Sequence, residues 1–370
     1  MDKKLSILLE VLKNKKRNIC YGAGVYGQRL LGFLRAHKLN LDYFVVTGNN
    51  MPEEIFGVPV KNINEIDNCE DYNWLIGVSE KYTEEIKKIL ESKNIRPCFI
   101  TDDKNIENII EDALLVNQEF RNVISESRRC FILGTGGTIR LQDLKNLYNE
   151  DVFSCSFCSL LEDYNYINPK YYVLPALTSD PVEIGKERET YIREKINFFS
   201  KTITSNVIFC DYYDYNYIQY YKGFKGKKIY YLYQAGEWDD ERRCTYDLCA
   251  KTPAIQTGSI MMLKIAIFMG YKEIYLIGTE HDLVTHNYGH AYDLEKLKGL
   301  GFDELFKIAT SQNIGIETRK NRDILRMSLN MYNQYYYLNN IAKLNGVHIY
   351  NATEGGSLDE FERTRFEELF

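Results

Sequence analysis

The stretch "RCFILGTGGTIRLQDL", residues 129–144, joins a short apolar run to a glycine-rich turn and then to a segment with the spacing of a helix. A strand, a glycine turn and a helix together form the unit from which parallel α/β sheets are built. Backbone N–H groups at such a turn are available to bind phosphate. A second turn of this kind occurs earlier, in "NICYGAGVYGQRLLGFL" at 18–34. We therefore ask which of the two turns performs chemistry.

Apolar runs alternate with helix-like segments along the whole chain. The predicted strands are short apolar runs bounded by turn residues, at 18–24, 41–48, 73–79, 96–101, 129–136, 151–160, 169–177, 228–234, 272–282 and 347–353. The predicted helices have apolar residues three or four apart, at 1–17, 25–38, 80–94, 103–128, 138–149, 255–271 and 320–345. This alternation predicts an α/β fold with two consecutive Rossmann-like domains and mainly parallel sheets, over residues 1–120 and 121–370.

The composition restricts the classes of function. The chain has 370 residues, of which 45% are hydrophobic and 26% charged, as in soluble globular proteins. Its formal net charge of −6 argues against bulk nucleic-acid binding. We find no secretion signal and no apolar run of the ~20 residues needed to span a bilayer, so we expect a cytoplasmic protein. The nine cysteines are interpreted as free thiols with no metal-ligand or disulfide-framework spacing.

The first glycine turn has the full G-x-G-x-x-G pattern, at Gly22, Gly24 and Gly27. In a dinucleotide site an acidic residue ends the next strand, whereas here Asp42 opens it. Nucleotide binding and simple close packing of the glycines therefore both remain open. The first hundred residues resemble the small Rossmann-like domains attached to bacterial surface-sugar enzymes, such as sugar acyltransferases and sugar C-methyltransferases. We interpret this domain as an accessory module.

The second part of the chain carries several motifs in order. The turn "FILGTGGTIRLQDL" is followed by "VFSCSFCSL", by "PKYYV" and by "TGSIMMLKIAIFMGYKEIYLIGTEHD". These motifs resemble, in order, those of the family 42 sialyltransferases and of the MptE-like proteins related to archaeal 6-hydroxymethylpterin diphosphokinase. The ending "VHIYNATEGGSLDEFERTRFEELF" resembles the last strand and tail of MptE-like surface-polysaccharide proteins. The resemblance covers about residues 125–370.

The resemblance implies a fold and an activity for this second domain. The expected fold is the GT-A variant of the family 42 enzymes. The expected activity is nucleotide-sugar-dependent glycosyl transfer in bacterial surface polysaccharide or glycoconjugate synthesis, with a CMP-activated nonulosonate as donor and a glycan as acceptor. No cofactor is required, a homo-oligomer is expected, and a peripheral association with the inner face of the membrane is compatible with this role. The alternatives are a Mg²⁺-dependent diphosphokinase of the hydroxymethylpterin type and a non-catalytic scaffold for glycan assembly.

Positions that match the family motifs are the expected donor-binding residues. They are Gly134, Thr135, Gly136, Gly137, Thr138, Ser156, Thr257, Gly258, Ser259, Glu280, Tyr292 and Arg319. Backbone N–H groups and threonine hydroxyls can donate hydrogen bonds to anionic oxygens. For the small residues among them, close packing is the alternative explanation.

Three of the five histidines, His281, His286 and His290, follow the end of one predicted strand within ten residues. Open α/β sheets bind ligands at the carboxyl ends of their strands, and an imidazole of pKa ~6.5 can accept or donate a proton there. Surface-loop histidines are the alternative. A divalent metal held with Glu280 and Asp282 is another, although the spacing is no recognised metal signature and we expect none.

The identity of the catalytic base stays open at this point. One family tyrosine corresponds to Asp282 and the other to His290, and the family histidine corresponds to Glu317 or Thr318. The candidates are therefore His281, Asp282, His286, His290 and Glu317.

Overall fold

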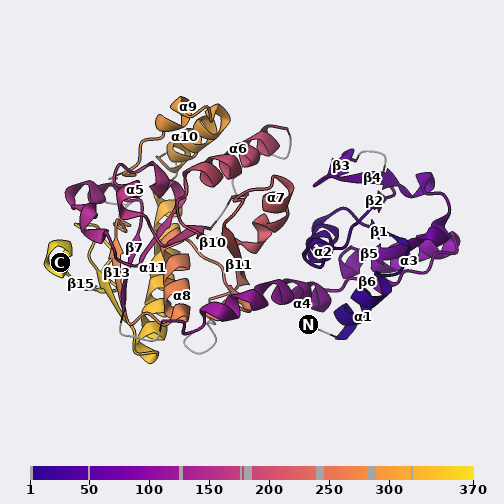
Figure 1. Cartoon of the computed structure of the whole chain (residues 1–370), viewed down its shortest axis with the longest axis horizontal. Coiled ribbons are helices and arrows are strands. Elements are labelled where there is room, and N and C mark those ends of the chain that lie inside the picture. Colours follow the sequence, from indigo (N-terminus) through magenta and orange to yellow (C-terminus); the bar gives the residue numbers. More distant parts are fainter. Residues whose placement is uncertain are drawn as a thin grey trace. The chain divides into compact units, whose positions relative to one another are not determined.

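The computed structural model describes residues 3–48, 51–124, 128–175, 177–178, 186–238, 246–281, 289–317 and 320–370. The chain divides into two compact units. Unit 1 comprises Met1–Leu115 with Tyr215–Tyr220, and unit 2 comprises Val116–Asp214 with Tyr221–Phe370. Each unit has its own mainly parallel sheet, so the mixed α/β class predicted from the alternation is confirmed (Figure 1).

Unit 1 contains a six-stranded sheet in the order β3-β4-β2-β1-β5-β6. Its strands are β1 Arg17–Tyr21, β2 Tyr43–Val46, β3 Glu54–Ile55, β4 Val58–Asn62, β5 Tyr72–Ile76 and β6 Phe99–Ile100. Its helices are α1 Lys3–Val11, α2 Val25–Ala36, α3 Glu80–Ser92, α4 Asp103–Leu114 and α7 Tyr215–Tyr220, with short 3₁₀ turns at Ile63–Glu65 and Cys69–Asp71. The strand pairs are parallel except for the hairpin of β3 and β4, which the sequence did not predict.

Unit 2 contains a nine-stranded sheet in the order β12-β11-β10-β9-β8-β7-β13-β14-β15, with every pair parallel. Its strands are β7 Arg129–Leu133, β8 Val152–Cys155, β9 Tyr171–Leu174, β10 Val207–Asp211, β11 Lys228–Gly236, β12 Lys251–Pro253, β13 Glu273–Ile277, β14 His348–Asn351 and β15 Glu362–Arg363. Its α-helices are α5 Tyr164–Ile167, α6 Lys186–Thr202, α8 Gly258–Met269, α9 Lys296–Gly299, α10 Asp303–Glu317 and α11 Asn321–Leu344. The 3₁₀ segments are η3 Leu115–Phe120, η4 Gly137–Leu141, η5 Leu144–Leu147, η6 Ser156–Leu160, η7 Tyr212–Asp214 and η8 Phe366–Leu369.

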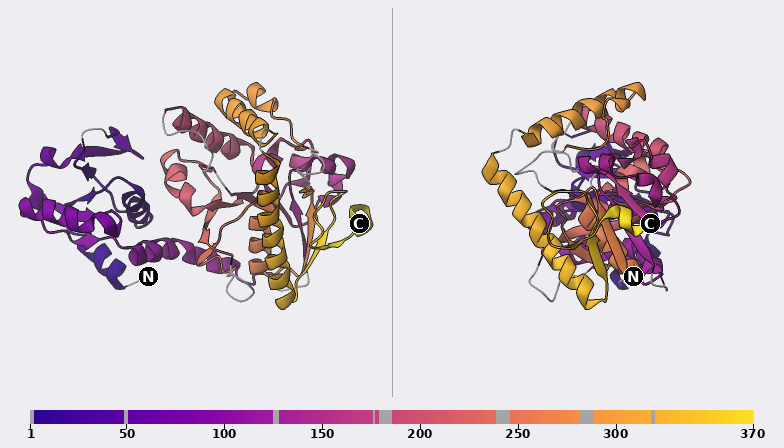
Figure 2. Two further views of the ribbon diagram at one scale, coloured as in Figure 1. Left: turned by 180° about the vertical axis from the view of Figure 1, so that it is seen from behind. Right: turned by 90° about the vertical axis from the view of Figure 1, so that its left-hand side faces the viewer.

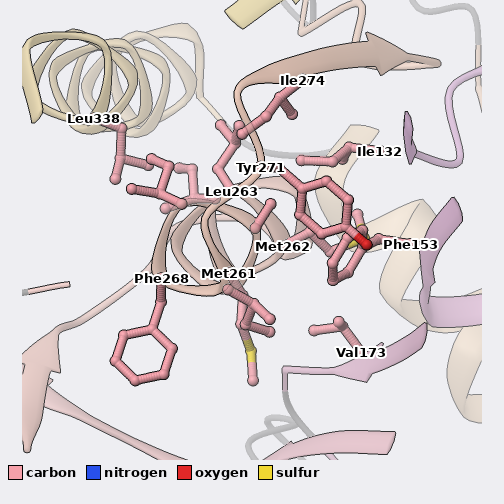
Figure 3. Packing of buried hydrophobic residues seen from close by; sticks show 14 of the residues in the cluster. Ile132, Phe153, Val173, Met261, Met262, Leu263, Phe268, Tyr271, Ile274 and Leu338 are labelled. Carbon is pink, nitrogen blue, oxygen red and sulfur yellow. The ribbon is translucent and has the colours of Figure 1, made fainter. Parts of the chain in front are cut away.

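Helix α8 is the centre of the core of unit 2. Eleven of its twelve residues are buried, and nine of these are apolar. The two polar ones, Ser259 and Lys264, are buried too, so no polar stripe faces solvent. Figure 3 shows Met261, Met262 and Leu263 among side chains of the sheet and of α11. Helices α8 and α11 also lie side by side in the left view of Figure 2, in agreement with their contacts. A helix that is apolar on all sides is stable only when it is covered on all sides.

Alternation along β9 divides the side chains between two layers. Tyr171 and Val173 join the core around α8, whereas the ring of Tyr172 lies 6.3 Å from that of Phe199 in α6. Successive side chains of a strand point to opposite faces of the sheet. Helices α8 and α6 therefore cover opposite faces of the sheet of unit 2.

The strand order of unit 2 reverses beside β7. From β7 the chain adds β8 to β12 on one side, and it then returns to place β13 and β14 on the other. Ligands of open α/β sheets bind outside the carboxyl ends of the strands at such a reversal. The second glycine turn directly follows β7 and therefore lies at this reversal.

Three predictions about local structure are wrong. The helix expected over residues 103–128 ends at Leu114, and the 3₁₀ segment η3 follows it. Residues 138–149 were expected to form a helix, but they form η4 and η5, separated by Gln142 in an extended conformation. Hydrogen bonds from Thr138 to Glu280 and from Gln142 to Ala352 hold this segment against the sheet and prevent a continuous helix. The strand expected at 151–160 ends at Cys155, because Ser156 takes a left-handed conformation with φ of 50°.

No helix in the described part of the chain is long and apolar enough to cross a membrane.

Candidate functional site

The second glycine turn is bonded to the end of β13. The N–H of Gly134 donates to the carbonyl of Ile277 at 2.8 Å, and that of Gly136 donates to the carbonyl of Gly278 at 3.0 Å. A Cβ on Gly134 would lie only 2.3 Å from the carbonyl oxygen of Gly278. The close approach of the two backbones therefore requires glycine at position 134. The N–H groups of Gly134 and Gly136 are bonded to the protein's own carbonyls and are not available to a ligand.

A carboxylate occupies the turn itself. The N–H of Thr138 donates to Oε1 of Glu280 at 2.6 Å, and the Thr138 hydroxyl donates to the same oxygen. A Cβ on Gly136 would lie 1.4 Å from Oε2 of Glu280, so the glycine makes room for this side chain. Thr138 and Glu280 were both predicted to bind the donor, and the structure pairs them with each other. A phosphate at Thr138 would have to displace this carboxylate.

The C-terminal tail fixes the backbone of Glu280. The N–H of Ser357 donates to the Glu280 carbonyl at 2.8 Å. Gly356 has a φ of 78°, and a Cβ there would lie 2.5 Å from the Cα of Glu280. Gly356 was not among the predicted site residues, although the pair of glycines in "TEGGS" is a signal for a tight approach.

His290 lies against the glycine turn. Its Nδ1 is 3.1 Å from the hydroxyl oxygen of Thr135 and 3.4 Å from the Thr135 carbonyl oxygen. Its ring stacks on Tyr292 with centroids 4.8 Å apart, and its carbonyl accepts from Arg140 at 2.8 Å. The residue as a whole is exposed, but its ring faces Thr135 and Tyr292, and this partial desolvation lowers the pKa of His290.

His281 belongs to a partly buried chain of hydrogen bonds. Its Nε2 lies 2.6 Å from the hydroxyl of Tyr335 in α11, and that hydroxyl lies 3.3 Å from the hydroxyl of Thr257. The carbonyl of His281 accepts from the Tyr332 hydroxyl at 2.9 Å. Desolvation lowers the pKa of His281 to about 4, so the imidazole is neutral at physiological pH. The residue has a φ of 50°, a conformation that side chains rarely adopt.

The start of α8 lies beside the end of β8. Thr257 is the N-cap of α8, and its side chain makes no capping hydrogen bond to the first turn of the helix. Gly258 packs on Cys155, and a Cβ on this glycine would lie 3.0 Å from the cysteine Sγ. Of the predicted donor-binding residues, Ser156, Thr257 and Gly258 are half-buried at these strand and helix ends, and Ser259 is buried.

A cavity of about 480 Å³ adjoins the glycine turn. Its polar walls come from Arg140, Glu162, Asp163, Asp293 and Lys296. Volumes of this size accommodate small molecules. Ile139 and Ala291 also line the cavity.

Four of the predicted site residues lie wholly or in part outside the described residues. Asp282, His286 and Arg319 lie outside the described residues. Glu317 ends α10, and its side chain also lies outside the described part. Among the residues that the structure does describe, no group of three or more His, Cys, Asp or Glu side chains is arranged to hold a metal ion.

The first glycine turn is explained largely by packing. A Cβ on Gly22 would lie 2.5 Å from the Gly77 carbonyl oxygen, and a Cβ on Gly27 would lie 2.0 Å from that of Gly22. Only Gly24, the N-cap of α2, has open space around it. Two of the three glycines predicted as a nucleotide site therefore have a structural reason of their own.

Two buried acids at the end of β10 were not predicted. Asp211 accepts from Gln234 at 3.0 Å, and Asp214 accepts from the Thr178 hydroxyl at 2.7 Å. Burial raises the pKa of Asp211 to about 7 and that of Asp214 to about 6. The signal was present in "IFCDYYD", where an apolar run ends in acidic residues.

The interpretation of the cysteines needs one correction. The eight described cysteines are free thiols. However, the expectation that no spacing is recognisable was wrong, because Cys155 and Cys158 have the spacing C-x-x-C.

Comparison of the chain with models of protein families, with curated proteins and with solved structures gave no match.

Proposed function

We propose that unit 2 is a nucleotide-sugar-dependent glycosyltransferase of the family 42-like type, with the GT-A-variant fold of those enzymes. Its role would be in bacterial surface polysaccharide or glycoconjugate synthesis, with a CMP-activated nonulosonate as donor. The observation that carries the proposal is the position of His290. This histidine lies beside the glycine turn, at the point where the strand order of the sheet reverses.

His290 is the proposed base. When Nδ1–H donates to the Thr135 carbonyl, Nε2 keeps its lone pair and can accept the proton of an acceptor hydroxyl. The hydroxyl oxygen then attacks the anomeric carbon of the donor as the bond to the nucleotide phosphate breaks. His281 is less suited to this step, because its Nε2 is already bonded to Tyr335 and its pKa is about 4.

The nucleotide phosphate is assigned to the start of α8 instead of to Thr138. The Glu280 carboxylate repels an anion at Thr138, whereas the first turn of α8 carries N–H groups that Thr257 does not cap. The Thr257 hydroxyl and the half-buried Ser156 lie at the same edge of the sheet. This placement retains Thr257, Gly258 and Ser156 from the predicted donor site. Thr138 stays bonded to Glu280 and does not contact the donor.

A thermal-shift screen of the full chain tests nucleotide binding. The probes are CMP, CDP, UDP, GDP, ATP, NAD and NADP, each with and without Mg²⁺. A ligand that binds the native state raises Tm by mass action, and we expect CMP to do so without Mg²⁺. Thr257→Val should reduce the shift, whereas the matched change Thr364→Val, outside the proposed site, should not. A shift that Thr257→Val leaves unchanged would remove the Thr257 hydroxyl from the proposed site.

The alternatives give different results in the same screen. A shift with ATP that requires Mg²⁺ would favour the diphosphokinase. For that reaction Glu280 would first have to leave Thr138 before it could bind a metal ion. No shift with any of the nucleotides would favour the non-catalytic scaffold.

A further inference from the structure

Three segments that are remote from one another in the sequence line the cavity beside the second glycine turn. They are 139–144, which follows β7, 160–163, which follows β8, and 291–296, which comes after β13. The first two leave the carboxyl ends of neighbouring strands, the edge at which open α/β sheets bind ligands. The volume of about 480 Å³ lies within the range of about 300–1,000 Å³ that is typical of small-ligand sites.

Gln142 lines this cavity and has an unused acceptor. The residue is 7% exposed, and its Nε2 donates to the carbonyl of Ala352 at 2.7 Å. Because a carbonyl can only accept, Nε2 must face Ala352, and Oε1 is left for another partner. Among the described residues this Oε1 has none. A buried acceptor without a donor costs free energy, so a ligand in the cavity that carries an O–H group can supply what is missing.

Two carboxylates in a second wall segment are also unused. Glu162 and Asp163 line the cavity, and neither side chain has a hydrogen bond or ion pair with any described residue. Asp163 is the N-cap of α5, yet its side chain makes no capping bond. Ionised carboxylates only accept hydrogen bonds. Together with Gln142 they favour a ligand that has several donors.

The charges of the walls favour a neutral ligand. The charged residues that line the cavity are Arg140, Glu162, Asp163, Asp293 and Lys296. The carboxylates outnumber the cations, and both cations already donate to carbonyls, Arg140 to His290 at 2.8 Å and Lys296 to Leu160 at 2.9 Å. An anion such as a phosphate is therefore disfavoured, and the two cations disfavour an amine in the same way.

The rest of the wall is apolar. It consists of Ile139, Leu144, Leu160, Leu161 and Ala291. A sugar ring combines C–H faces, which suit apolar walls, with hydroxyl groups, each of which can donate and accept a hydrogen bond. A neutral sugar ring therefore matches both the polar and the apolar parts of this cavity.

We propose that the cavity binds one neutral sugar ring, whose hydroxyls donate to Gln142 Oε1 and to the carboxylates of Glu162 and Asp163. If the transferase function proposed above holds, on which this assignment rests, the ring is the terminal sugar of the acceptor. Ala291 of the cavity wall directly follows His290, and its N–H donates to the carbonyl of Thr135 at 2.9 Å. The subsite is thereby joined to the turn that holds the proposed base, and the anionic donor binds separately at the start of α8.

Saturation-transfer NMR with the full chain tests the binding of sugars. The probes are the methyl glycosides of galactose, glucose, mannose and N-acetylglucosamine, with glucuronate as the anionic ring, each with and without CMP. We expect a signal from at least one neutral glycoside that CMP does not displace, and none from glucuronate. No signal from any of the four glycosides would overturn the inference, as would displacement by CMP or a signal from glucuronate that equals theirs.

Variants of the unused acceptors locate the bound sugar. Glu162→Ala and Asp163→Ala should each raise the Kd of the glycoside about tenfold and leave Tm unchanged, because each removes a charged hydrogen-bond acceptor that has no structural partner. Asp359→Ala, at an exposed position outside the cavity, is the matched control and should keep the Kd of the wild type. Gln142→Met should weaken binding too, and its Tm is measured as well because it also removes the bond to Ala352. A Kd that neither Glu162→Ala nor Asp163→Ala changes would place the sugar elsewhere and overturn the inference.

The sugar site and the transferase function can fail separately, because glycoside binding is measured without a donor. A thermal shift with CMP but no glycoside signal would remove the acceptor subsite and leave the transferase. Glycoside binding that depends on Glu162 and Asp163, with no shift from any nucleotide, would keep the sugar site and remove the transferase.

Discussion

The carboxylate of Glu280 fills the space in which a side chain at position 136 would begin: a Cβ on Gly136 would lie 1.4 Å from Glu280 Oε2. The same carboxylate accepts from the N–H and the hydroxyl of Thr138. A glycine turn with the features of a phosphate site is thus filled by an anion from the protein itself.

Gly136→Ala should therefore destabilise unit 2. The added methyl group forces the buried carboxylate away from Thr138, and we expect a loss of about 3 kcal/mol in the free energy of unfolding. Urea unfolding followed by Trp238 fluorescence in a Trp74→Phe background measures this loss, because the chain has two tryptophans, one in each unit. In a Glu280→Ala background, Gly136→Ala should reduce the free energy of unfolding by less than it does in the wild type. Strict additivity of the two changes would contradict the proposed clash.

Gly27→Ala should destabilise unit 1, whereas Gly24→Ala should not. A Cβ at position 27 would lie 2.0 Å from a backbone oxygen, but one at position 24 meets open space. We expect a cost of about 3 kcal/mol for the first change and less than about 1 kcal/mol for the second. Trp74 fluorescence in a Trp238→Phe background reports the unfolding of unit 1. Equal effects of the two variants would mean that packing does not explain the first glycine turn.

Asp211→Asn should make unit 2 less sensitive to rising pH. The native pKa of about 7 lies above the ordinary 3.8, so the native state binds the proton more tightly than the unfolded chain. The contribution of Asp211 to the free energy of unfolding is therefore present at low pH. It falls by about 1.4 kcal/mol per pH unit as the pH rises from 3.8 to about 7. Asparagine resembles the protonated acid, and rotation of the Gln234 amide lets its Oε1, which has no partner among the described residues, accept the new N–H.

Unfolding at pH 5 and pH 8 measures this difference. The variant should gain stability relative to the wild type at the higher pH. The exposed Asp359→Asn should show no such change. A gain of equal size at both values would show that Asp211 does not titrate in this range.

His281→Asn should reduce the loss of stability in acid. The native pKa of about 4 lies below the ordinary 6.5, so this residue contributes stability above pH 6.5 that is lost as pH falls toward 4. Asparagine tolerates the left-handed backbone at this position. The variant is expected to be less stable than the wild type at pH 7, with a smaller deficit at pH 5. His348→Asn, on an exposed strand position, is the control, and a deficit that does not change with pH would exclude titration of His281.

His290→Ala should keep the Tm of the wild type and lose transfer from CMP-N-acetylneuraminate. The reason is that His290 is exposed and supplies the proposed base, so its removal costs little packing. Release of CMP in the presence of a glycan acceptor measures the reaction. His348→Ala should react as the wild type does. Unchanged turnover of the His290 variant would remove His290 from the mechanism.

Local patterns in the sequence predict much of the fold. The apolar runs of β7, β9, β13 and β14 were predicted as strands, and α8 and α11 were predicted as helices. In a buried strand or helix the spacing of apolar residues follows the repeat of that element, so it can be recognised in the sequence. The segment 138–149 was mispredicted because Thr138 and Gln142 bond to residues that are remote in sequence. Short strands such as β15, which pair over only two residues, leave no such period.

The candidate site was predictable in its location but not in its pairings. The glycine turn and His290 were expected at one edge of the sheet, and the structure brings them together. The contact of His281 with Tyr335 was not foreseen, because Tyr335 is one of 30 tyrosines and lies inside a long helix. A hydrogen bond between a loop and a distant helix has no signature in either segment alone.

The burial of α8 on every side has a consequence for synthesis of the chain. One side of α8 packs on β7, β8 and β9, which the ribosome makes earlier, and another packs on α11, which it makes later. Until α11 emerges, part of an apolar helix stays exposed to water and to other nascent chains. Folding of unit 2 must therefore wait for its last long helix, and during that interval the growing chain is a natural client for chaperones.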